Sequence, residues 1–209
     1  MNTMRTISPI VALLVSSFAF STASATTMTY DGMGLSSVVR VHASGVNVLT
    51  DAGQMRIGYE GQNYLGYCVE IYQDAGTADV TELPVSSLQN GDMVAYLYET
   101  YHAGADTGLK AAALQVAIWE VINESAKNAF NAGSGKFHIS QNSDVRKLAN
   151  EWLSTLPNSY QLPSSALVLH SPTNQDVLIG SGRQVPEPAC LAVLALGGMV
   201  MMARRKHFA

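Results

Sequence analysis

Residues 109–124 read Leu-Lys-Ala-Ala-Ala-Leu-Gln-Val-Ala-Ile-Trp-Glu-Val-Ile-Asn-Glu, and this segment is the most informative part of the chain. It holds no glycine or proline, and its apolar spacing predicts a helix over 109–130, opened by Asp106-Thr107-Gly108. One face is expected to be polar and to carry Lys110, Ala113, Ala117, Glu120, Glu124 and Lys127. The opposite, buried face consists of Ala111, Ala112, Gln115, Ile118, Trp119 and Ile122.

Gln115 is the anomaly of this helix, because it lies in the middle of the face that should be buried. A buried amide without a partner costs about 1–3 kcal/mol. Some group must therefore satisfy it. The simplest expectation is a hydrogen bond to a neighbouring backbone.

The segment before the helix has the pattern of β-structure. Apolar Val39, Val41 and Ala43 alternate with polar or exposed neighbours, which is the period of a strand with one buried face. Turn-forming residues at 44–45 and 60–62 divide residues 36–72 into several strands. The last of these, over 63–72, is rich in strand-forming residues and contains Cys68.

Two more helices and three short strands complete the expected elements. One helix opens at Gly91 with Asp92 as its N-cap, and the other covers 145–156 and ends before Pro157. Strands are expected at 136–140, 166–170 and 176–179. This order predicts an α+β fold, a β-sandwich or barrel with a helical subdomain packed at one side.

Charge and hydropathy indicate one acidic domain between two apolar ends. The chain is 47% hydrophobic with a mean hydropathy of +0.11, but five of its nine methionines lie near the termini. Residues 26–183 carry 8 Lys and Arg against 15 Asp and Glu, a net charge of −7. Nucleic acids and anionic membrane surfaces require clustered positive charge, so this balance argues against both as partners.

The N-terminal 25 residues have the three parts of a secretory signal peptide. Arg5 supplies the positive charge, residues 10–20 the apolar segment, and Ala23-Ser24-Ala25 the small-residue cleavage site. The alternative is a permanent membrane anchor, but the apolar segment is shorter than the roughly 20 residues that a span needs. Export with cleavage after Ala25 is therefore expected.

The C-terminal residues 184–209 also have three parts. Pro186-Glu187-Pro188 is followed by an apolar run over 189–203 and a basic cluster over 204–206. This arrangement resembles the PEP-CTERM sorting signal of Gram-negative bacteria. The resemblance implies transient insertion in the inner membrane, processing by an exosortase-type protease near the Pro-Glu-Pro motif, and a final place at the cell surface or in a biofilm matrix. The alternative is a plain tail anchor.

Cysteine usage leaves one thiol in the mature domain. The chain has two cysteines, Cys68 and Cys190, and Cys190 lies in the C-terminal apolar run. Exported proteins usually carry cysteines in pairs, so a lone Cys68 is unusual. Its thiol could be buried and inert, joined to another molecule by a disulfide, or functional.

Two short motifs resemble the signatures of the bacterial thioester domains of surface adhesins. They are Tyr67-Cys68-Val69-Glu70 and the segment over 114–119, Leu-Gln-Val-Ala-Ile-Trp, and the resemblance spans residues 66–124. In that family the cysteine thiol and the glutamine amide condense with loss of ammonia. The resemblance therefore implies an internal thioester between Cys68 and Gln115. One departure is Leu114, where many family members have threonine.

A thioester of this kind implies covalent adhesion. An amine or hydroxyl of a partner, such as a protein lysine or a polysaccharide, would attack the Gln115 carbonyl carbon and release Cys68. Tyr67 and Trp119 are expected to exclude water, and Glu70 to lie in the same environment. The reaction occurs once per molecule and needs no metal or other cofactor, so the protein would be a binder and not an enzyme.

Two other functions remain open at this point. One is a cysteine hydrolase or acyltransferase that uses Cys68 with His102 or His138 as base, although neither histidine lies in a recognisable catalytic motif. The other is a structural matrix protein in which Cys68 and Gln115 are ordinary core residues. The five histidines show no spacing typical of metal ligands.

Overall fold

The structure is a computed structural model that describes residues 26–125, 130–160 and 164–180. The expected signal peptide, residues 1–25, lies outside the described residues. So does the expected sorting segment, 184–209, with Pro186, Glu187 and Pro188.

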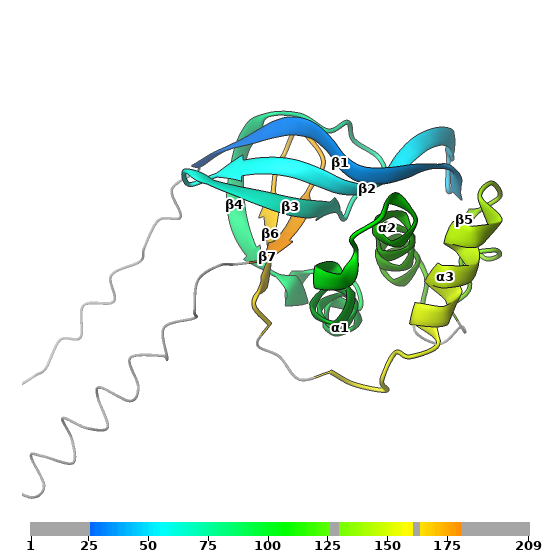
Figure 1. The fold of residues 1–209 in the computed structure, drawn as a ribbon. Helices are drawn as coiled ribbons and strands as arrows, with labels where there is room; N and C mark the ends of the chain where they lie inside the picture. The colour runs from blue at the N-terminus through cyan, green and yellow to red at the C-terminus, as the bar shows by residue number, and fades with distance from the viewer. Residues whose placement is uncertain (1–25, 126–129, 161–163, 181–209) are drawn as a thin grey trace, which may run out of the picture.

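Six antiparallel strands close into a barrel (Figure 1). In chain order they are β1 (Thr26–Ala43), β2 (Val46–Tyr59), β3 (Gln62–Cys68), β4 (Ala78–Pro84), β6 (Ala166–His170) and β7 (Val177–Gly180). Hydrogen-bonded pairing runs from β1 through β2, β3, β7, β6 and β4 and returns to the start of β1. A short strand of two residues, β5 (His138–Ile139), pairs with the far end of β1.

The β1–β2 hairpin is longer than the barrel and reaches over the helices (Figure 1). Its strands pair from Thr29↔Gly58 to Ala43↔Val46, with the turn at 44–45 that the sequence predicts. The register shifts twice, between Tyr30 and Ser36, because β1 carries an extra residue at each shift. Such bulges bend a strand and strengthen its twist, so the same hairpin can pair within the barrel and also pack against helix α2.

Three α-helices lie under the far half of this hairpin: α1 (Gly91–Tyr101), α2 (Gly108–Asn123) and α3 (Ser143–Leu153). Short 3-10 turns, η1 (Val85–Ser87) and η2 (His102–Gly104), flank α1. Helix α2 is the central one and contacts β1, β2, α1 and α3. The predicted α+β class is therefore confirmed, with the barrel and the helical part side by side.

The predicted polar face of α2 is wrong from Ala113 to Glu124, whereas Lys110 is partly exposed as expected and Lys127 lies outside the described residues. Every residue over 111–121 is buried, and Glu120 and Glu124 are 0% and 4% exposed. The helix has protein on all sides, so no face remains for water. In place of water, the carboxyl groups of Glu120 and Glu124 accept hydrogen bonds from the backbone N–H groups of Asn131 (2.7 Å) and Phe137 (3.0 Å), respectively.

Helix α2 ends at Asn123, earlier than residue 130, where the sequence analysis ends it. Glu124 is already extended, and the side-chain amide of Asn90 donates to the carbonyls of Val121 (2.8 Å) and Glu124 (3.1 Å). These carbonyls lie at the end of the helix, where no intrahelical donor is available. Asn90, which precedes Val121 by 31 positions in the sequence, thus caps the end of the helix.

Other boundaries differ in smaller ways. Asn90, in the left-handed conformation at φ +53°, precedes α1, so Asp92 lies in the first turn and is not the N-cap. Strand β4 is absent from the expectations because Ala78–Pro84 has no clear apolar alternation. The strand expected over 166–170 is confirmed to the residue.

Candidate functional site

The amide of Gln115 is held by the main chain of Cys68. Gln115 Oε1 accepts the backbone N–H of Cys68 at 2.9 Å, and Gln115 Nε2 donates to the backbone carbonyl of Cys68 at 2.7 Å. The two residues are 1% and 4% exposed. The expectation of a neighbouring backbone partner for the buried amide is confirmed. That partner is the one cysteine of the described chain.

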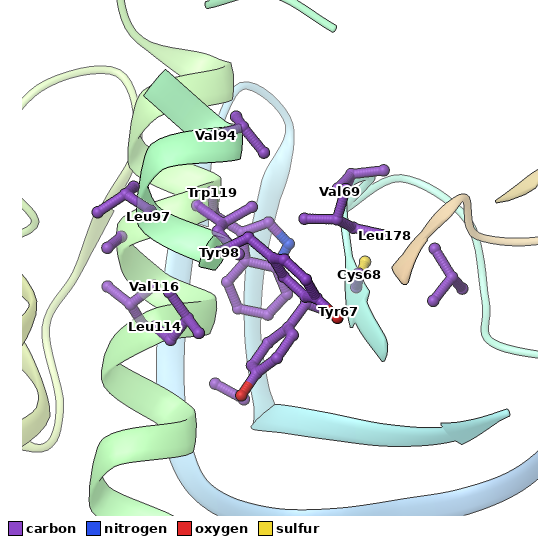
Figure 2. Packing of buried hydrophobic residues seen from close by; sticks show 14 of the residues in the cluster. Tyr67, Cys68, Val69, Val94, Leu97, Tyr98, Leu114, Val116, Trp119 and Leu178 are labelled. Atoms are coloured by element: carbon purple, nitrogen blue, oxygen red, sulfur yellow. The ribbon is translucent and has the colours of Figure 1, made fainter. Parts of the chain in front are cut away.

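Cys68 reaches this position because strand β3 changes its pairing partner from β2 to β7. The strand pairs with β2 as far as Gly66 and with β7 from Tyr67, and Cys68 faces Val177 in that pairing. The next residue, Val69, donates its N–H to the carbonyl of Asp176 at 3.0 Å, which continues the pairing by one bond. Figure 2 shows Cys68 at the end of this strand, facing the helix that carries Trp119.

The thiol of Cys68 is protonated at neutral pH. Burial raises its pKa to about 12, and the thiol donates to the backbone carbonyl of Glu70. A thiol in such an environment is a poor free nucleophile, because the thiolate is the reactive form.

Trp119 lies beside the thiol. Its indole Nε1–H makes no hydrogen bond of ordinary geometry within the described residues. It is nevertheless close enough to the sulfur to favour the thiolate and to offset part of the rise in the pKa of Cys68. A buried donor with no other partner is therefore available to stabilise negative charge on this sulfur.

Glu70 and Tyr67, the other two residues expected at the site, do not place their side chains beside the thiol of Cys68. The Glu70 carboxylate accepts from the Gln73 side chain at 3.0 and 3.2 Å, so Glu70 approaches Cys68 through its backbone. The Tyr67 ring packs edge-on against Tyr98, with ring centroids 6.1 Å apart, and lines a different cavity from the one beside Cys68. Successive side chains of a strand point to opposite faces, which explains this separation.

A pocket of about 330 Å³ opens beside Cys68, Gln115 and Trp119. Its far wall is β2, through Val46, Val48 and Thr50 among others. Asp51 and Asp74 also line it, and no lysine or arginine of the described residues does. Nothing in the sequence marks these two carboxylates as site residues, because only the fold brings Asp51 and Asp74 to the same pocket as Cys68 and Gln115.

No histidine of the described residues lines this pocket or hydrogen-bonds to Cys68. His102 bonds to the carbonyl of Tyr98 at 2.8 Å, and the ring of His138 stacks on His42 with centroids 4.7 Å apart. His170 pairs with Asp176 at 2.9 Å. The histidines named for a hydrolase thus lack the contact with the sulfur that a general base makes.

The described part of the chain contains no cluster of three or more histidine, cysteine or carboxylate side chains that could hold a metal ion. Within the same residues, no helix is both long and apolar enough to cross a membrane.

No protein-family model, curated protein or solved structure matches the chain.

Proposed function

We propose that this protein is an exported covalent binder whose Cys68 and Gln115 form an internal thioester. The observation that carries the proposal is the pair of hydrogen bonds between the Gln115 amide and the main chain of Cys68. These bonds fix the plane of the amide and hold its carbon next to the residue whose sulfur must attack it. The likeness of both motifs to thioester-domain signatures supports the same pairing.

The bonds that form and break in the condensation all involve atoms of these two side chains. Cys68 Sγ bonds to Gln115 Cδ, the C–N bond breaks, and the thiol proton leaves with the nitrogen as ammonia. The Cys68 N–H already donates to Gln115 Oε1, the oxygen that becomes negative in the tetrahedral intermediate. A donor fixed beforehand at that oxygen lowers the barrier without reorganisation.

The same groups serve the reaction with a partner. An amine or hydroxyl attacks Gln115 Cδ, the C–S bond breaks, and the partner's proton ends on Cys68. The Trp119 Nε1–H supports the departing sulfur. The high pKa of Cys68 then keeps the released thiol protonated and inert. One molecule therefore makes one bond, without a cofactor.

The near-complete burial of both residues supports a long-lived thioester. Water must reach the acyl carbon to hydrolyse it, and Cys68, Gln115 and Trp119 are each at most 4% exposed. Access is limited to the pocket side. A cysteine hydrolase must regenerate its thiolate at every turnover with a base in contact with the sulfur, and among the described residues no histidine makes that contact.

The proposal extends to the two ends of the chain. The signal-like N-terminus and the Pro-Glu-Pro segment support export, transient inner-membrane insertion, exosortase-type processing, and display at the cell surface or in the matrix. The covalent target would be a protein lysine or a polysaccharide hydroxyl. The rival function is a structural matrix protein in which the Cys68–Gln115 contact is ordinary core packing.

Intact mass of the purified protein tests the thioester. The full chain and its Cys68→Ala variant are expressed and exported in the same host, so that terminal processing is the same in both. Only the wild type can lose ammonia by forming the thioester. We therefore expect the mass difference between the two proteins to be smaller, by the mass of one ammonia, than the difference between cysteine and alanine. Methylamine should then add to Gln115 in the wild type only. Masses that differ by the substitution alone, with no methylamine adduct, would favour the structural protein.

A further inference from the structure

Part of strand β2 has an unpaired edge. β2 pairs with β1 along nearly its whole length, but with β3 only over Met55–Tyr59. β3 leaves after the Met55↔Gly66 pair and turns to β7. Among the described residues, no strand lies on the side of Val46–Gly53 away from β1. Figure 1 shows the β1–β2 hairpin continuing beyond the end of β3.

The place that β3 leaves coincides with the pocket beside the site. Val46, Val48 and Thr50 of the unpaired segment form one wall, and Cys68 and Gln115 line the same pocket. A strand laid along this edge would take the position that β3 would occupy if it continued. Its side chains would alternate between the two faces, and those on one face would enter the pocket.

The edge lacks several of the features that usually protect such strands. Val48 and Leu49 are 46% and 48% exposed, although both are apolar. Residues 46–53 contain no lysine and no proline, the residues that commonly block pairing with another chain. An exposed apolar edge of this kind is typical of an interaction site.

The charge of the pocket indicates what kind of segment fits. Among the described residues that line it, Asp51 and Asp74 are the only charged ones. A side chain that enters this pocket therefore meets two carboxylates and no cation of the described residues. This charge favours a positively charged side chain.

We propose that an extended, lysine-bearing segment of a partner protein adds to the β2 edge over Val46–Gly53. The added strand fills the place that β3 leaves, and its lysine enters the pocket toward Gln115. Main-chain hydrogen bonds give affinity and the acidic pocket selects the side chain, as in other strand-addition complexes. The covalent step rests on the proposed thioester, whereas the docking does not.

The docking is tested without the thioester, in the Cys68→Ala full chain. The probe is a capped peptide of alternating threonine and valine with a central lysine, of similar length to Val46–Gly53. Amide hydrogen exchange is measured at saturating peptide. We expect protection of the 46–53 amides to rise by about tenfold or more, with little change elsewhere in the barrel. No added protection over 46–53 would overturn the proposal.

Two matched sets of variants separate strand addition from unspecific adsorption. Because an added strand uses alternate N–H groups, one of two peptides N-methylated at odd or at even positions should lose binding and the other should keep it. Val48→Asp should weaken binding, and Leu65→Asp, a change at an exposed leucine outside this pocket, should not. Equal effects of the two peptides would contradict main-chain pairing. Protection that depends on protein concentration, without peptide, would assign the edge to a second copy of the chain and overturn the proposal.

The wild-type protein then links docking to reaction. The rate of adduct formation with the lysine peptide is compared with the rate for methylamine. We expect the peptide to react about tenfold faster or more, because docking raises the local concentration of its amine. A failure of methylamine to react would refute the thioester alone, since the exchange experiment still decides the docking. Equal rates for the peptide and methylamine would count against docking as a route to the bond.

Discussion

The buried carboxyl group of Glu120 should make the protein less stable as the pH rises toward neutrality. Its side chain is 0% exposed, one oxygen accepts the N–H of Asn131, and the other has no hydrogen-bond partner among the described residues. Burial, the largest cause, and the charge of Glu124 together raise the pKa of Glu120 from 4.5 to about 7, against the opposing effect of the Asn131 bond. Replacing this carboxyl group by an amide tests how much its burial lowers the free energy of unfolding.

The sign follows from proton binding in the two states. Between pH 4.5 and about 7 the folded protein keeps the Glu120 proton and the unfolded chain loses it. The free energy of unfolding therefore falls as the pH rises through this window, by at most about 1.4 kcal/mol per pH unit. The full penalty above the window is about 3 kcal/mol as an upper limit, and relaxation around the site reduces it to roughly 1–3 kcal/mol.

Urea unfolding at pH 5 and pH 8 measures the effect of Glu120→Gln. All proteins carry Cys68→Ala, so that thiol chemistry does not interfere. We expect the variant to be more stable than its parent by about 1–3 kcal/mol at pH 8 and nearly equal to it at pH 5. Glu151→Gln, at an exposed position of α3, is the control and should show no such difference. A Glu120→Gln effect that is the same at both pH values would refute the reasoning.

Three further substitutions test packing around the site, each by urea unfolding. Gln115→Leu leaves the buried N–H and carbonyl of Cys68 unpaired and should cost about 2–4 kcal/mol; a loss below about 1 kcal/mol would mean that water replaces the amide. Asn90→Gly keeps the left-handed backbone but removes both bonds to the end of α2, so we expect a loss of about 1–2 kcal/mol, and an unchanged midpoint would show that the cap is dispensable. Gly53→Ala brings a Cβ within 2.3 Å of the Leu35 carbonyl oxygen at φ +150°, and a loss of about 2 kcal/mol or more is expected; a neutral result would contradict the close approach of the two strands.

Local patterns in the sequence were enough for much of the site. The period of α2 put Gln115 on a face that had to be buried, and the strand-forming residues around Cys68 put the thiol on a strand. Both inferences rest on spacings of two to four residues, which the backbone geometry of strands and helices determines directly. The α+β class followed from the order of the same elements.

Contacts between distant residues decided the rest. Only the folded chain shows that α2 is covered on every side, so Glu120 and Glu124 are buried and not solvated. The end of α2 depends on Asn90, and the gap beside β2 exists because β3 changes partners at Tyr67. A periodicity states which face of an element is apolar, but it carries no information about which element covers that face. The sequence by itself therefore determined that the buried amide of Gln115 needs a partner, and the tertiary structure determined that this partner is the main chain of Cys68.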